Sequence, residues 1–283
     1  MIGTSHGLLC FHAEGHHDDT PATDTVVLWN VSIRKGVSFV VPNVGDDIYK
    51  TALGFGVCRV TRDVKIVKIR CILSWEDVVS ISSIPWQVEV FTLSTRAWRS
   101  PYSNLPRKSI HFRSKQVAID GLVYWLAYDM ITMDVWYSRF RNLIISFDMT
   151  TEEFKEVNLP NSLARLPLYK LSFFKLRGSV GVLEHGERGN DLVFGVWMME
   201  DGVSNSFSML FNVNVPMAFM KGFRKSGEPI IQLSKQEHGR ARLVVYEHDS
   251  KRMDSLGFDG IEGSIYVYPY VETLLLLDQP DLT

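Results

Sequence analysis

The chain has 283 residues, of which 46% are apolar, 12% aromatic and 22% charged. This composition predicts a folded protein with a large core and excludes an intrinsically disordered chain. The formal net charge is −2, so we expect neither a nucleic acid nor an anionic membrane surface as partner.

Local signals in the sequence point to an intracellular protein. The three cysteines, Cys10, Cys58 and Cys71, stand in apolar stretches, which is typical of buried thiols in a reducing compartment. The first residues lack a basic region and a long apolar run, so we predict no secretory signal peptide. The apolar runs, such as 274–277, are far too short to span a bilayer. We therefore expect the protein in the cytoplasm, in the nucleus or in both.

Apolar and polar residues alternate with a period of two along most of the chain, which predicts short β-strands. In chain order, the predicted strands are 7–11, 26–30 and 37–41, then 51–58, 64–71, 87–93 and 97–101, then 116–119, 122–128, 143–148 and 154–159, then 170–176, 179–183, 191–199 and 207–213, then 222–225, 229–233, 240–248 and 251–256. Two more predicted strands, 263–268 and 271–277, follow them. The dipeptides Asp120-Gly121 and Arg177-Gly178 predict tight hairpin turns.

One aromatic residue recurs in each group of strands, at steps of 62, 56, 50 and 49 residues. These aromatics, which we expect to pack blade against blade, are Trp29, Phe91, Phe147, Trp197 and Tyr246. A repeat of this length built from short strands is typical of a propeller blade. We therefore predict an all-β, kelch-like β-propeller of four-stranded antiparallel blades in a single domain, 1–283. It would have five blades and a partial sixth from 263–277, which returns beside the N-terminal blade because ring closure hides sheet edges. We favour an incompletely closed ring.

Several stretches resemble landmarks of the plant F-box-associated domain. The segments 7–11 (GLLCF), 26–30 (VVLWN) and 32–35 (SIRK) resemble the opening of that family, and 54–57 (GFGV) with 63–67 resembles its next landmark. The segment 117–126 (VAIDGLVYWL) is similar to a third landmark, and 144–160, 243–246 and 270–274 match others. Val31, Val64 and Phe207 depart from the usual residues, and we interpret these departures as changes in packing.

The resemblance implies a non-catalytic protein-interaction module, the part of an SCF-type ubiquitin ligase that recruits a target protein. Family members carry an upstream F-box that grips the Skp adaptor of a cullin ligase, and nothing in this sequence resembles it. We therefore expect Skp and cullin as partners only through an F-box missing here, and no catalysis, metal or cofactor. The alternatives are a propeller enzyme, a binder of small molecules or glycans, and an F-box-less fragment or decoy.

Two motifs that could hold ligands are better explained without them. The residues His12, His16, His17, Asp18 and Asp19 lie in a stretch rich in Gly, Thr and Pro, so we expect a solvated loop rather than a metal site. The Gly54-x-Gly56 pair has no third glycine and no following helix, so it is not a phosphate cradle.

The predicted topology places long loops on one face of the blades, and insertions on one face commonly mark a binding surface. The loops 12–25, 72–86 and 129–142 carry the large aromatics Trp75, Trp86, Trp136 and Tyr137. A basic connector on the same face adds Arg107, Lys108 and Arg113. We predict a partner-binding site from these seven residues. The alternatives are a solvated connector and aromatics that fold back over the blade edges.

Overall fold

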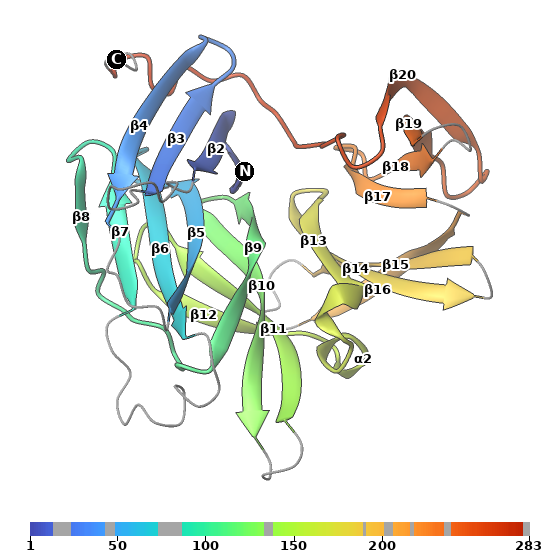
Figure 1. The fold of residues 1–283 in the computed structure, drawn as a ribbon, viewed down its shortest axis with the longest axis horizontal. Helices are drawn as coiled ribbons and strands as arrows, with labels where there is room; N and C mark the ends of the chain where they lie inside the picture. The colour runs from blue at the N-terminus through green and yellow to red at the C-terminus, as the bar shows by residue number, and fades with distance from the viewer. Residues whose placement is uncertain are drawn as a thin grey trace. The chain divides into compact units, whose positions relative to one another are not determined.

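The structure is a computed structural model that describes residues 1–13, 24–42, 49–72, 87–132, 138–188, 191–200, 206–215, 218–234 and 239–279. Within these ranges, twenty strands form five four-stranded antiparallel sheets. Each sheet takes four strands in chain order, so each is one blade (Figure 1). The blades confirm the predicted all-β propeller with five four-stranded blades. No helix of the described residues is long and apolar enough to cross a membrane.

The strands follow one another closely along the chain. Blade 1 consists of β1 (Gly3–Ser5), β2 (Leu8–Ala13), β3 (Asp24–Asn30) and β4 (Lys35–Val41). Blade 2 consists of β5 (Tyr49–Val57), β6 (Val64–Ile72), β7 (Val88–Thr92) and β8 (Ala97–Arg99). Blade 3 consists of β9 (Ile110–Ile119), β10 (Leu122–Thr132), β11 (Ser138–Asp148) and β12 (Phe154–Asn158).

The last two blades have the same order. Blade 4 consists of β13 (Leu171–Leu176), β14 (Ser179–Arg188), β15 (Asp191–Met199) and β16 (Phe207–Asn214). Blade 5 consists of β17 (Ala218–Phe223), β18 (Pro229–Ser234), β19 (Arg240–Tyr246) and β20 (Met253–Ile261). A four-residue helix, α2 (Asn161–Ala164), and a single 3₁₀ turn, η1 (Leu168–Lys170), precede blade 4.

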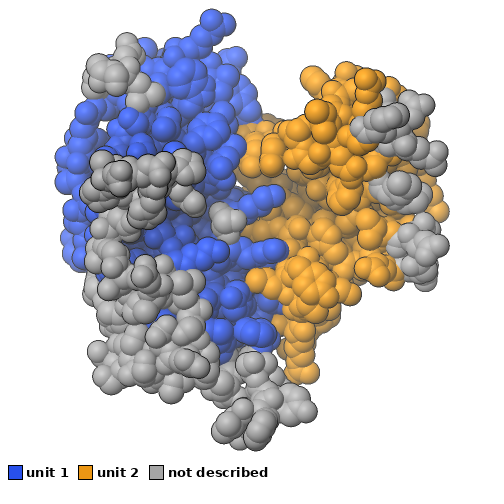
Figure 2. Space-filling model, in the orientation of Figure 1, with its two compact units in different colours: residues 1–157, 270–283 blue, residues 158–269 orange. Residues whose placement is uncertain are grey.

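The chain divides into two compact units, coloured separately in Figure 2. Unit 1 comprises residues 1–157 and 270–283, and unit 2 comprises residues 158–269. Unit 1 therefore holds the first three blades together with a C-terminal segment that follows unit 2 in the sequence.

The tight turns and the recurring aromatics lie where the sequence predicts them. Both residues of the Asp120-Gly121 turn and of the Arg177-Gly178 turn have positive φ, as a two-residue hairpin loop of type I′ requires. The five aromatics all lie near the end of the third strand of their blade. The side chains of Phe91, Phe147 and Tyr246 are buried, whereas Trp29 and Trp197 are half-buried.

The first strands of the three blades of unit 1 pack against one another around one glutamine. The amide of Gln116 in β9 donates to Phe55 O (2.9 Å) and accepts from Phe55 N (2.7 Å) in β5. The buried indole of Trp125 lies against Gly54, where an added Cβ would be 2.1 Å from Trp125 Cζ2. The Gly54-x-Gly56 motif thus serves close packing between β5 and β10.

The two strands predicted after blade 5 are wrong. The strand β20 ends at Ile261, and the described residues 262–279 form turns and irregular segments without a strand. The backbone carbonyls of 273, 275 and 277 accept hydrogen bonds from side chains of blade 1, in place of the backbone hydrogen bonds that a strand would make. The partial sixth blade is consequently wrong as well. Blade 1 is completed instead by β1, which at three residues is too short to show alternation in the sequence.

Candidate partner-binding site

Four of the predicted site residues fall where the structure gives no description. The aromatics Trp75, Trp86, Trp136 and Tyr137 lie outside the described residues, as do His16, His17, Asp18 and Asp19 of the histidine-rich stretch. Their role in binding stays a prediction. The described member of that stretch, His12, has its Nε2 atom 3.2 Å from a carboxylate oxygen of Asp24 across β2 and β3. The described residues contain no group of three potential metal ligands.

The basic connector between β8 and β9 is engaged in ion pairs. The guanidinium of Arg107 pairs with Asp129 (Nε to Oδ2, 2.7 Å) and with Glu156 (Nη1 to Oε1, 3.0 Å). These carboxylates belong to β10 and β12, so Arg107 ties the connector to blade 3. Lys108 is partly buried beside it, and Arg113 is exposed in β9. Because two carboxylates already pair with Arg107, its guanidinium is less available to a partner than the sequence suggests.

A buried ion cluster joins blades 2 and 3. The carboxylate of Glu152, in the β11–β12 turn, accepts from Lys65 Nζ (2.8 Å) in β6 and from both Nη atoms of Arg99 (2.6 and 2.7 Å) in β8. Lys65 also donates to Met149 O (2.7 Å). Burial alone would raise the pKa of Glu152, but the hydrogen bonds from Arg99 and Lys65 outweigh burial and lower that pKa below its ordinary value.

The neighbouring β5–β6 turn holds an unusual thiol. Burial disfavours the thiolate of Cys58, yet hydrogen bonds from Thr61, Thr150 and the backbone of Val60 lower the pKa of this thiol to about 7. The other two cysteines behave as expected of buried thiols. Burial raises the pKa of Cys71 to about 12, and that of Cys10 rises further.

Residues 270–279, which we name the strap, pass the β3–β4 turn of blade 1 (Figure 1). The fully buried Asn30 at the end of β3 donates through Nδ2 to Thr273 O (2.9 Å) and Leu275 O (2.7 Å). The next anchor is Lys35, which donates to Leu277 O (2.8 Å). The strap side chain Leu276 is buried in the apolar core of blades 1 and 2.

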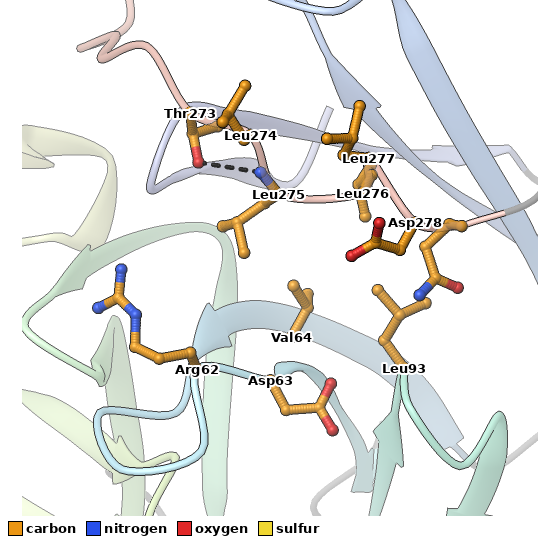
Figure 3. A pocket seen from close by; sticks show the side chains of 11 residues that line it. Arg62, Asp63, Val64, Leu93, Thr273, Leu274, Leu275, Leu276, Leu277 and Asp278 are labelled. Atoms are coloured by element: carbon orange, nitrogen blue, oxygen red, sulfur yellow. Dashed lines mark hydrogen bonds between the residues drawn. The ribbon is translucent and has the colours of Figure 1, made fainter.

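A groove of about 410 Å³ lies between the strap and the β5–β6 and β7–β8 turns. Its apolar lining includes the buried side chains of Val64, Leu93 and Leu276. Its polar lining includes Arg62, Asp63, Asp278 and Gln279 (Figure 3). A concave site with an apolar floor and a few polar groups at its edge is a common form of binding site.

The polar groups at this groove are unequally engaged. The carboxylate of Asp63 accepts from Ser94 N (3.2 Å) and from Ser94 Oγ. The guanidinium of Arg62 points away from that carboxylate (Figure 3) and has no ion-pair or hydrogen-bond partner among the described residues. Arg96 donates to Gln279 (3.3 Å) at the other end of the groove.

The sequence did not reveal this groove. The sequence predicts a strand at 271–277 because four leucines in succession fit a buried strand as well as a surface segment. The predicted return of 263–277 to blade 1 is confirmed by the hydrogen bonds from Asn30 and Lys35. These two anchors are more than 240 residues away from the strap, and nothing in the sequence marked them as its partners.

A family model described as "F-box associated beta propeller domain" matches residues 1–278. The chain belongs to this family. An F-box/kelch-repeat protein of Arabidopsis thaliana is 24% identical over 97% of this chain and 68% of its own length. The F-box protein CPR1 of the same plant is 24% identical over 81% of this chain and 57% of its own. This F-box-associated chain thus spans about two thirds or less of each of these relatives.

Among solved structures, the β-propeller domain of the Trilobed protease from Pyrococcus furiosus aligns with a TM-score of 0.49 and 13% identity. The alignment covers 89% of this chain and 68% of that one. The membership confirms the resemblance found in the sequence, in which the same landmarks follow one another along most of the chain.

Proposed function

We propose that this chain is a non-catalytic protein-interaction module that recruits a target protein to an SCF-type ubiquitin ligase. The observation that carries the proposal is the family match over residues 1–278, together with relatives that are F-box proteins. Two of the ionisable groups described above have structural partners, which supports a binding role rather than a catalytic one. The carboxylate of Glu152 and the guanidinium of Arg107 are both held in structural ion pairs.

Target capture by the purified chain tests this proposal. The immobilised chain is exposed to plant extract, captured proteins are identified by mass spectrometry, and each is then purified and titrated against the chain by calorimetry. We expect at least one protein to bind saturably with a dissociation constant on the order of micromolar or below. Absence of any direct, saturable protein binder would refute the interaction role.

The cellular half-life of the captured protein separates a recruiter from a decoy. If the chain works within a ligase, raising its level shortens the half-life of the target, and a proteasome inhibitor restores it. A decoy without access to the ligase lengthens that half-life, because it shields the target. Enzymatic removal of glycans from the target before titration checks the glycan-binding alternative, and we expect unchanged affinity.

A further inference from the structure

The strap concentrates exposed apolar surface beside the groove. Eleven large apolar side chains are exposed among the described residues of unit 1, and four of them lie in the strap itself, between residues 270 and 277. These four are Tyr270, Val271, Leu274 and Leu277. The side chains of Leu274 and Leu277, which are 69% and 53% exposed, line the groove. Clustered exposed apolar residues next to a concave site are typical of an interaction surface.

The charges at the groove favour an acidic partner. Three cationic side chains line the groove or bind its lining residues, namely Arg62, Lys35 and Arg96, against the carboxylates of Asp63 and Asp278. Two hydrogen bonds from Ser94 already engage Asp63. A carboxylate brought in by a partner would find an unpaired guanidinium at Arg62, and charge-assisted hydrogen bonds to arginine are among the stronger polar contacts.

The backbone of the β5–β6 turn holds Arg62 in place. Its N–H donates to Cys58 O (3.0 Å), and Cys58 N donates to Asp63 O (2.8 Å), which closes the turn on both sides. Arg62 has φ of 60°, a left-handed conformation that glycine adopts most easily. The turn therefore fixes the Cα–Cβ direction of an exposed arginine at the edge of the groove.

From these observations, and resting on the proposed function, we infer that the groove binds an extended segment of the target that carries an apolar side chain next to a carboxylate. The apolar side chain occupies the space over Val64, Leu93 and Leu276. The adjacent carboxylate pairs with Arg62. The exposed faces of Leu274 and Leu277 cover the rest of the segment. The partner of this surface is thus an acidic–apolar peptide segment of a protein.

Selection from a displayed library of random 12-residue peptides tests this inference on the purified full chain. We expect enriched peptides to combine Asp or Glu with a neighbouring Leu, Ile, Phe or Met. Resynthesised, labelled peptides are then titrated by fluorescence polarisation. The charge reversal Arg62→Glu is expected to weaken binding by at least about tenfold, and Leu277→Asp by a similar factor. Rising salt is expected to weaken binding to the unaltered chain.

Lys251→Glu is the matched control, because Lys251 is also an exposed cation with left-handed backbone in a tight turn, but lies in blade 5 of unit 2. It should leave the affinity within about twofold, because Lys251 is not among the residues that line the groove. The melting temperature of each variant is measured to check that it is folded. Three results would refute peptide binding at the groove. They are failure to enrich any peptide, enrichment of peptides without the acidic–apolar pattern, and equal affinity of the peptides for Arg62→Glu and for the unaltered chain. The target capture described above would still decide the proposed function.

Discussion

Glu152 combines a buried carboxylate with a left-handed backbone, φ 60°, and it joins Lys65 of β6 to Arg99 of β8. Substitution with glutamine keeps the shape but leaves Lys65 with its charge buried and unmatched. We expect Glu152→Gln to lower the free energy of unfolding by about 3 kcal/mol, because removing one partner of a buried pair leaves the other uncompensated. Urea denaturation measures this change. The adjacent, exposed Glu153→Gln should cost less than about 0.5 kcal/mol, and an equal cost at both positions would contradict the assignment.

The same carboxylate gives the stability a dependence on pH. The pKa of Glu152 is lowered in the folded state relative to the unfolded chain. Its contribution to stability is therefore fully present above the unfolded pKa of about 4.3 and is lost as pH falls through the folded value. We expect unfolding midpoints measured from pH 7 to pH 3 to fall more steeply for the unaltered chain than for Glu152→Gln. Parallel curves would show that other groups control acid stability.

At the scale of single elements, the contact between β5 and β10 depends on the absence of one side chain. A Cβ at Gly54 would meet Trp125 Cζ2 at 2.1 Å and Gln116 Oε1 at 2.8 Å, and the indole is fully buried. We expect Gly54→Ala to destabilise the chain by about 2 kcal/mol or more, since overpacking forces a buried side chain to move. Thermal unfolding measures it. Gly186→Ala is the control, because its nearest neighbour would be 3.5 Å away.

The strap is held by hydrogen bonds rather than by a strand ladder, and Asn30 supplies two of them. Asn30→Asp keeps the side-chain oxygen that accepts from Ser32 N but removes both donors to the strap. We expect a loss of about 2 kcal/mol and faster amide exchange in 270–279, while exchange in blades 4 and 5 stays unchanged. Ser32→Ala, which removes a more exposed strap contact, should have a smaller effect. Unchanged exchange in the strap of Asn30→Asp would show that other contacts hold it.

Over the whole molecule, the features predicted correctly from the sequence are those encoded locally. The strands around Phe91 and Phe147 follow from alternation within a few residues, and the Asp120-Gly121 turn follows from two. The return of 263–277 to blade 1 was predicted correctly, from the need of a propeller to hide its sheet edges. The non-strand conformation of the strap and the groove beside it were not predictable, because the run of leucines is anchored by Asn30, far away in the sequence. The ion cluster of Glu152 was not predicted for the same reason, because Lys65 and Arg99 come from another blade.

The strap also sets the order in which unit 1 is completed during protein synthesis. Asn30 and Thr273 are 243 positions apart, so at translation rates of about 5–20 residues per second the nascent blade 1 waits roughly 12–50 seconds for its last contacts. Throughout that interval the donors of Asn30 and the core site of Leu276 are open to solvent and to chaperones. A chain stalled on the ribosome anywhere before residue 270 therefore exposes an unfinished unit 1, which cellular quality control can recognise.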